Sequence, residues 1–222
     1  MQWGEIRSWY PARGLSIATQ GPLNRRRRRR LRKLLSETKS FTKESGAKVH
    51  NAALDWVHES FHNWRTYIGD RSDFDVLEIG SLNINGSPRG IIEPFSRSYY
   101  GIDMQDGPGV DKVMNAAEFV MPDSFDVIVC CEVFEHTPQW KQIIDNCHTN
   151  LREGGIFIAT MAGETRKPHS GVHGNAPYDW EHYANIGEWE LAQKLRQLFE
   201  YHETSYINPM VHGDLRCWAV KD

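Results

Sequence analysis

The amino-acid sequence predicts an α/β protein built on a doubly wound, mostly parallel sheet. Short apolar segments alternate with helical or polar segments along most of the chain, which is the order expected of such a sheet. Two apolar segments, 74–81 (FDVLEIGS) and 124–134 (SFDVIVCCEVF), are nearly continuous, as expected of strands buried on both faces. Acids, amides or glycine follow several of these segments, and in open α/β sheets ligands bind outside the carboxyl ends of the strands.

The first expected element of the folded part is an amphipathic helix over residues 47–64. Its apolar residues recur at spacings of three, four and seven, which is typical of a helix that packs one face on a core. His50, His58 and His62 lie on or near the polar face of this helix. We expect them to be exposed to solvent rather than bound to a metal.

The remaining elements follow in order. Strands are expected at 74–81, 98–104, 111–116, 124–134, 155–163, 201–208 and 215–222, and helices at 137–155 and 186–199. In the helix over 137–155, Thr137 is the expected N-cap, Pro138 takes the first helical position, and Gly154–Gly155 ends the helix. The last two strand segments are expected to pair as a hairpin.

Composition fits one globular domain with some additional length. The chain has 222 residues, of which 40% are hydrophobic and 25% charged. It contains no run of about 18 apolar residues, and its first residues lack the apolar core of a signal peptide. Four cysteines, two of them adjacent in an apolar run, are not typical of a disulfide framework. We therefore expect a cytoplasmic protein that does not contact a membrane.

Positive charge is concentrated near the N-terminus. Residues 25–33 (RRRRRRLRK) carry eight positive charges, and subtracting them from the net charge of −3 leaves −11 for the rest of the chain. We expect residues 1–42 to form a basic, poorly ordered extension and residues 43–222 to form the folded domain. The basic segment could contact nucleic acid or another polyanion, whereas the acidic remainder disfavours a nucleic-acid cleft within the domain.

The segment 76–90 (VLEIGSLNINGSPRG) predicts a cofactor loop. Glycine at 80 and 86 would let backbone approach a ligand closely, but the G-x-G-x-x-G spacing of a dinucleotide loop is missing. A pyrophosphate is therefore disfavoured, while a nucleoside with a small zwitterionic tail is acceptable. Asp103 follows Gly80 by 23 residues, where an acid can accept hydrogen bonds from both ribose hydroxyls, and Asn115 could bind a purine edge.

Five segments carry a family resemblance: DVLEIGS, YYGIDM, VMNAAEF, SFDVIVCCEVFEH and LREGGIFIAT. Together they resemble the successive motifs of the class I S-adenosylmethionine-dependent methyltransferases, over roughly residues 45–222, and most closely a bacterial and phage group. The resemblance implies a Rossmann-like, seven-stranded sheet with an antiparallel last strand. It also implies S-adenosylmethionine as cofactor and a methyl-acceptor substrate, with O-methylation preferred.

The resemblance assigns cofactor contacts residue by residue. It places Glu78 and Gly80 on the methionine side, Asp103 at the ribose, Met104, Asn115 and Ala116 at the adenine, and the Cys131 backbone along the methionine. Ser81 stands where the family is usually rich in glycine, and we expect it in the same cofactor loop.

Residues 132–136 (EVFEH) follow the fourth strand on the expected acceptor side. Glu132, Glu135 and His136 could share one face of a helical turn, and such ligands suit Mg²⁺ or Mn²⁺. The E-x-x-E-H pattern is similar to that of small-RNA 3′-end 2′-O-methyltransferases and ubiquinone-pathway O-methyltransferases, where it is associated with a divalent metal. In other members it orients groups near the cofactor. We take His136, as general base, and Glu132 as candidate catalytic residues, and a metal at this cluster stays open.

The loop over residues 163–185 is rich in glycine, histidine and proline. Because long loops in compact domains are often lids or binding loops, we expect it to close over the acceptor. Its His169 and His173 could add a metal ligand. The alternative is a surface loop that is held in place by its aromatic residues.

Two other functions stay open at this stage. One is a methyltransferase-like module without turnover that binds nucleic acid through residues 25–33. The other is an NAD(P)-dependent oxidoreductase, which would also use an acid after the second strand but needs the missing glycine spacing.

Overall fold

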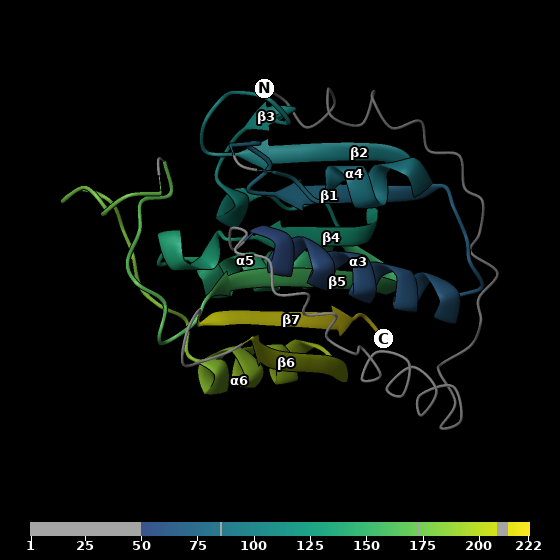
Figure 1. Cartoon of the computed structure of the whole chain (residues 1–222). Helices are drawn as coiled ribbons and strands as arrows, with labels where there is room; N and C mark the ends of the chain where they lie inside the picture. The colour runs from purple at the N-terminus through teal and green to yellow at the C-terminus, as the bar shows by residue number, and fades with distance from the viewer. Residues whose placement is uncertain (1–49, 85, 173, 208–212) are drawn as a thin grey trace.

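A computed structural model describes residues 50–84, 86–172, 174–207 and 213–222 (Figure 1). The expected extension over residues 1–42, its basic segment 25–33 and the candidate ligand His173 lie outside the described residues.

The core of the structure is one seven-stranded sheet in the order β3-β2-β1-β4-β5-β7-β6. The strands are β1 (Phe74–Ile79), β2 (Ser96–Asp103), β3 (Lys112–Val113), β4 (Phe125–Cys131), β5 (Leu151–Ala162), β6 (Tyr201–Ile207) and β7 (Asp214–Val220). The pairs from β3 to β5 are parallel, whereas β7 runs antiparallel to both β5 and β6. The predicted doubly wound, seven-stranded sheet with an antiparallel last strand is confirmed.

Helices cover both faces of this sheet (Figure 1). They are α3 (His50–Tyr67), α4 (Arg89–Ile92), α5 (Trp140–Asn150) and α6 (Glu188–Leu198), with 3₁₀ turns η1 (Glu93–Phe95), η2 (Ala116–Glu118) and η3 (Phe134–His136). Alternate side chains of β4 lie on opposite faces of the sheet. Val127 and Val129 pack with α3 on one face, and Ile128 packs with α5 and α6 on the other. This alternation explains why β4 reads as continuously apolar.

Two boundaries differ from the sequence expectation. The N-cap of α5 is Gln139, and the hydroxyl of Thr137 instead accepts a hydrogen bond from the Gln139 N–H at 3.1 Å. Strand β5 begins at Leu151, which pairs with Phe125, and the register with β4 shifts between there and Ile156. Gly154, with a φ of +79°, lies in this shifted segment. The glycine pair is thus an irregularity within a strand, as in a bulge, and the helix ends earlier.

An ion-pair network links neighbouring strands at the amino ends of β1, β2 and β4. The buried Asp75 carboxylate accepts hydrogen bonds from Arg97 Nε at 3.1 Å and Ser98 Oγ at 2.6 Å, and pairs with Arg152 at 2.9 Å. Arg152 also donates to Asp126 at 2.8 Å. This network lies at the amino ends of these strands, whereas a cavity lies at their carboxyl ends.

Within the described ranges, no helix is long and apolar enough to cross a membrane.

Candidate active site

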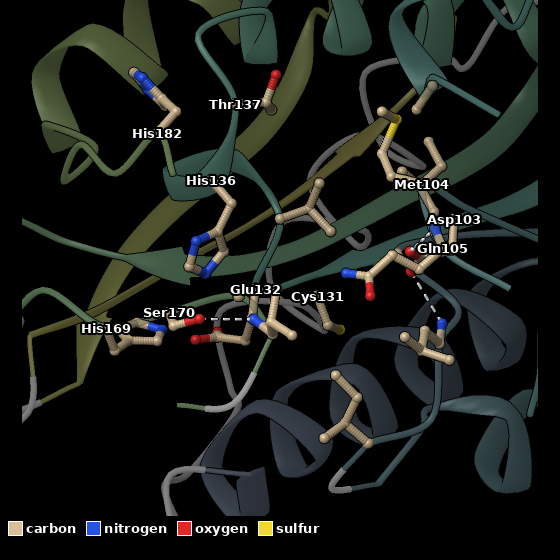
Figure 2. A pocket seen from close by; sticks show the side chains of 18 of the residues that line it. Asp103, Met104, Gln105, Cys131, Glu132, His136, Thr137, His169, Ser170 and His182 are labelled. Atoms are coloured by element: carbon tan, nitrogen blue, oxygen red, sulfur yellow. Dashed lines mark hydrogen bonds between the residues drawn. The ribbon is translucent and has the colours of Figure 1, made fainter. Parts of the chain in front are cut away.

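A cavity of about 920 Å³ lies at the carboxyl ends of β1, β2 and β4. The loop after β1, the residues after β2 and β3, the turn after β4, and the loop between β5 and α6 all contribute to its walls. Figure 2 shows Asp103 and Met104 on one side and His136 and His169 on the other. The cavity thus brings together residues from both the expected cofactor side and the expected acceptor side.

Asp103 ends β2, and the backbone on either side braces its carboxylate. Oδ2 accepts a hydrogen bond from the Leu82 N–H at 3.1 Å, and Oδ1 accepts one from the Gln105 N–H at 3.0 Å (Figure 2). Each oxygen keeps further acceptor capacity, so the carboxylate can receive hydroxyl groups without losing its own anchors. Met104 follows with 67% of its surface exposed and also lines the cavity.

Gly80 makes the sharp turn that follows β1. Its φ is +75°, and its N–H donates to the Ile102 carbonyl at 2.9 Å. A Cβ at this position would lie 2.2 Å from Cγ2 of Val133, which belongs to the turn after β4. Only glycine allows the loop after β1 and the turn after β4 to approach this closely.

Glu78 lies deeper, near the end of β1. It lines the cavity but is only 2% exposed, and Ser87 Oγ donates to its Oε1 at 2.9 Å. Burial raises the pKa of Glu78 to about 7, although hydrogen bonds and the charge of Arg89 oppose this rise. A ligand cation would therefore find a carboxyl group that is half ionised near neutral pH.

The other expected cofactor residues divide into two groups. Ala116 and Cys131 line the cavity, and burial raises the pKa of the Cys131 thiol, which therefore stays neutral. Asn115 also lines it, but its Oδ1 accepts the Ala117 N–H and its Nδ2 donates to Gln139 Oε1, both at 3.0 Å. The Oδ1 atom thus caps η2, and the side-chain amide keeps one donor hydrogen and further acceptor capacity, so contact with a purine edge stays a prediction.

Ser81 is the one expected cofactor residue that does not line the cavity. It is buried, and its hydroxyl lies directly against Gly101 in β2, where a Cβ on the glycine would come within 2.7 Å of Oγ. Ser81 therefore serves the packing between the β1 loop and β2.

On the acceptor side, Glu132 does not belong to the cluster of potential metal ligands that includes Glu135 and His136. Its φ of +54° is left-handed, and its Oε2 lies 3.8 Å from an Arg166 nitrogen. Arg166 also pairs with Asp214 at the start of β7. Burial raises the pKa of Glu132, and the charge of Arg166 opposes that rise. Glu132 directly follows β4, and its charge also raises the pKa of Glu135, so the two carboxyl groups interact.

Glu135, His136 and His169 do come together. One potential ligand atom of each lies within 4.8 Å of the others, and both histidine Nε2 atoms lie 4.0 Å from Glu135 Oε1. Glu135 is fully buried and its Oε1 also accepts the Ala162 N–H at 3.2 Å. Burial raises the pKa of Glu135 and lowers that of His136 to about 4, so the imidazole is neutral near pH 7 with a free lone pair, although it is a weaker base than an ordinary histidine. This triad of an oxygen and two nitrogens could also hold a divalent cation.

The loop between β5 and α6 forms one wall of the cavity. A parallel bridge between Gly163 and Ile186 joins its ends, and the Ala184 N–H donates to the Glu135 carbonyl at 2.8 Å. Trp180 lines the cavity, is 74% exposed, and stacks on Tyr178 with ring centroids 5.4 Å apart. Closure of this loop over an acceptor stays a prediction.

Two functional candidates were missed by sequence reasoning. Arg166 pairs with Glu132, and both line the cavity. Arg89 lies near Glu78 but does not line the cavity. Neither arginine stands at the end of an apolar segment, so no local pattern distinguishes them from surface cations.

A family model described as "Methyltransferase domain" matches residues 97–157 of the chain. The chain is 26% identical over 117 residues to the ubiquinone biosynthesis O-methyltransferase of Paraburkholderia xenovorans, covering 49% of this chain and 50% of that one. It is 31% identical over 121 residues to the enzyme of the same name from Parvibaculum lavamentivorans, covering 48% and 47%. The chain thus spans about half the length of these curated relatives.

Solved structures show the same fold. A Burkholderia thailandensis 1,6-didemethyltoxoflavin-N1-methyltransferase, solved with S-adenosylhomocysteine, aligns with a TM-score of 0.56 and 18% identity, over 77% of this chain and 78% of that one. The CurJ carbon methyltransferase aligns with a TM-score of 0.57 and 15% identity, over 79% and 56%. The chain has the class I methyltransferase fold. These methyltransferase relatives favour neither the oxidoreductase nor the binding-module alternative.

Proposed function

We propose that this class I methyltransferase domain binds S-adenosylmethionine in the cavity at the carboxyl ends of β1, β2 and β4. The observation that carries the proposal is the braced carboxylate of Asp103 beside the Gly80 turn, on a cavity that also contains His136. The donor set fits the cofactor: an acid for the ribose hydroxyls, a buried acid at Glu78 for the ammonium group, and apolar Met104 and Ala116 for the adenine.

When bound, the cofactor supplies an activated methyl group on a sulfonium. The residues of the chain then have two tasks, which are to align an acceptor nucleophile with that methyl group and to receive a proton if the nucleophile loses one. His136 is our candidate for the second task, because its imidazole is neutral and faces the cavity. Glu132, paired with Arg166, is better suited to fixing the geometry of the acceptor side.

We infer an acceptor hydroxyl as the preferred nucleophile. A hydroxyl must lose a proton on methylation, and a neutral histidine on the acceptor wall meets that need. The curated relatives carry O-methyltransferase names, which supports the same preference. A divalent cation held by Glu135, His136 and His169 is the second way to activate a hydroxyl, since a bound cation lowers its pKa.

The domain boundaries, the role of the basic segment and the cellular location are also proposals. We propose residues 43–222 as the catalytic domain and residues 1–42 as an extension whose basic segment, 25–33, contacts a polyanion. We also propose a cytoplasmic location, because the four cysteines are all unpaired in the structure and three are buried.

Turnover is tested by incubating the full chain with S-adenosylmethionine and deproteinised extract fractions, with RNA and protein fractions as separate arms. We expect S-adenosylhomocysteine to accumulate and a small molecule to become heavier by the mass of one methylene group. The Asp103→Ala variant provides the blank. If the wild-type chain binds the cofactor but forms S-adenosylhomocysteine no faster than Asp103→Ala in every arm, the result would favour a binding module without turnover.

A further inference from the structure

Arg89 begins α4, in the SPRG sequence that ends the loop after β1. It does not line the cavity, and its side chain is 25% exposed. Its guanidinium lies behind the cavity wall, with the Cζ atom 4.4 Å from the centroid of the Tyr99 ring. Because Arg89 does not line the cavity, its contacts with a ligand can only be indirect, through the residues to which it bonds.

The first segment held by Arg89 is the loop that follows β2. One terminal nitrogen donates to the Gly109 carbonyl at 2.9 Å and to Asp111 Oδ2 at 3.3 Å. Asp111 Oδ2 in turn accepts the Gly101 N–H of β2 at 2.6 Å. The loop runs from Asp103 to Asp111, so Arg89 anchors its far end while the Asp103 carboxylate lies at its near end.

The second contact is with Glu78. Arg89 Nε lies 3.9 Å from Glu78 Oε2, and Ser87, two residues before Arg89, donates to Glu78 Oε1. The Arg89 N–H donates to the same Ser87 hydroxyl at 3.0 Å. Both oxygens of the buried carboxyl group therefore face the segment that carries Arg89.

We propose that Arg89 is a positioning residue for cofactor binding, which joins the loop from Asp103 to the Glu78 carboxylate and so sets the affinity for the cofactor at both its ribose and its ammonium end. This inference rests on the proposed function, because it assigns Glu78 to the ammonium group. The cofactor itself would not touch Arg89.

Several other groups face Glu78 and enter any titration of it. They are the Tyr99 hydroxyl from β2, the Ser87 hydroxyl, Asp111 from the loop after β2, and the Cys131 thiol from the end of β4. Arg89 is the cation among the charges that act on Glu78, and Asp111 is the opposing anion. Removing the guanidinium takes away the cation and leaves the charge of Asp111 unopposed, which disfavours the ionised form of Glu78.

The test compares Arg89→Met, Arg89→Lys and the matched control Arg97→Met. Arg97, the second residue of β2, likewise pairs with a buried acid, but that acid is Asp75 at the opposite end of β1 from Glu78. The titration of Glu78 is followed in the cofactor-free protein by carboxyl ¹³C NMR, with Glu78→Gln to assign the resonance. The affinity for S-adenosylhomocysteine is measured by calorimetry from pH 6 to pH 9.

For Arg89→Met we expect the Glu78 midpoint to move upward by about one pH unit, since an opposite charge at this distance typically shifts a carboxyl pKa by that much or more. Affinity at pH 7 should fall by about tenfold, because Glu78 is then mostly neutral and the loop anchor is lost. Arg89→Lys keeps the charge but not the planar fork, so its Glu78 midpoint should stay near wild type while affinity still falls. Arg97→Met should alter neither readout.

An unmoved Glu78 midpoint in Arg89→Met, or an equal shift in Arg97→Met, would overturn the inference. Should Arg89→Met fail to fold, unchanged affinity in Arg89→Lys would have the same meaning. A wild-type protein that binds no S-adenosylhomocysteine at any pH would refute the proposed function, and the inference with it. Wild-type binding combined with unaffected Arg89 variants refutes the inference alone.

Discussion

Replacing Gly80 by alanine should weaken folding through two separable effects. The backbone φ of +75° is left-handed, which costs a residue with a Cβ about 1–2 kcal/mol. The new Cβ would also lie 2.2 Å from Val133 Cγ2, far inside van der Waals contact, and valine is stiff about χ1. Relieving such an overlap in a packed region costs about 1–3 kcal/mol. We therefore expect a total loss of about 2–5 kcal/mol in the free energy of unfolding.

Two further variants separate these contributions. Gly154 has nearly the same φ, +79°, and no atom lies within 4 Å of the position that a Cβ would take there, so Gly154→Ala should cost the backbone part alone. Combining Gly80→Ala with Val133→Ala removes the overlap but not the backbone strain, and the two substitutions should couple favourably by about 1–3 kcal/mol.

Urea unfolding at constant m-value gives these differences directly. Equal costs for Gly80→Ala and Gly154→Ala, or strictly additive effects with Val133→Ala, would refute the close approach between the cofactor loop and the turn after β4. The same variants also affect the site, because the Gly80 turn joins the end of β1, which carries Glu78, to the Leu82 N–H that donates to Asp103.

Affinity for S-adenosylhomocysteine should rise about tenfold from pH 6 to pH 8 as Glu78, with a pKa of about 7, ionises, and Glu78→Gln should abolish this rise in calorimetry. Burial would raise the pKa of Asp75, but its arginine and serine partners hold that pKa below its usual value. Its stabilising contribution is therefore present above about pH 4 and lost as the pH falls further, so urea unfolding of Asp75→Asn should depend less on acid than wild type does. His169→Ala should lower acceptor turnover while leaving cofactor affinity unchanged, and an EDTA titration of the wild type reports whether a cation is needed. Trp180→Ala should raise the KM for the acceptor. Trp189→Ala should not, because Trp189 is equally exposed but lies on α6, away from the cavity. Equal effects of the two substitutions would show that the loop between β5 and α6 does not contribute to acceptor binding.

Elements with strong local patterns could be predicted from sequence. Segments 74–81 and 124–134 are apolar on both faces because helices cover both sides of the sheet, and this burial leaves a readable signal. Asp103 was predicted at the cavity because strand ends in a parallel sheet converge on one edge. These inferences need only the sheet topology and the order of the strands.

Features that depend on contacts between distant segments could not be predicted. Gly154–Gly155 resembles a helix stop locally, but pairing of Leu151 with β4 extends the strand through it. The left-handed backbone of Glu132 has no local signal, nor does its position near Arg166 and outside the cluster of Glu135, His136 and His169. His169 is brought to His136 only by the path of a long loop.

We propose that the cavity beside the braced Asp103 carboxylate binds S-adenosylmethionine and not a dinucleotide. Calorimetric titration of the full chain with S-adenosylhomocysteine and, in parallel, with NADH tests it most directly, with Asp103→Ala as the site variant and Asp106→Ala, in the same loop but outside the cavity lining, as control. We expect S-adenosylhomocysteine to bind and NADH not to bind, with affinity for S-adenosylhomocysteine weakened by about tenfold or more in Asp103→Ala and unchanged in Asp106→Ala. Binding of NADH, or affinity for S-adenosylhomocysteine that is indifferent to Asp103, would contradict it.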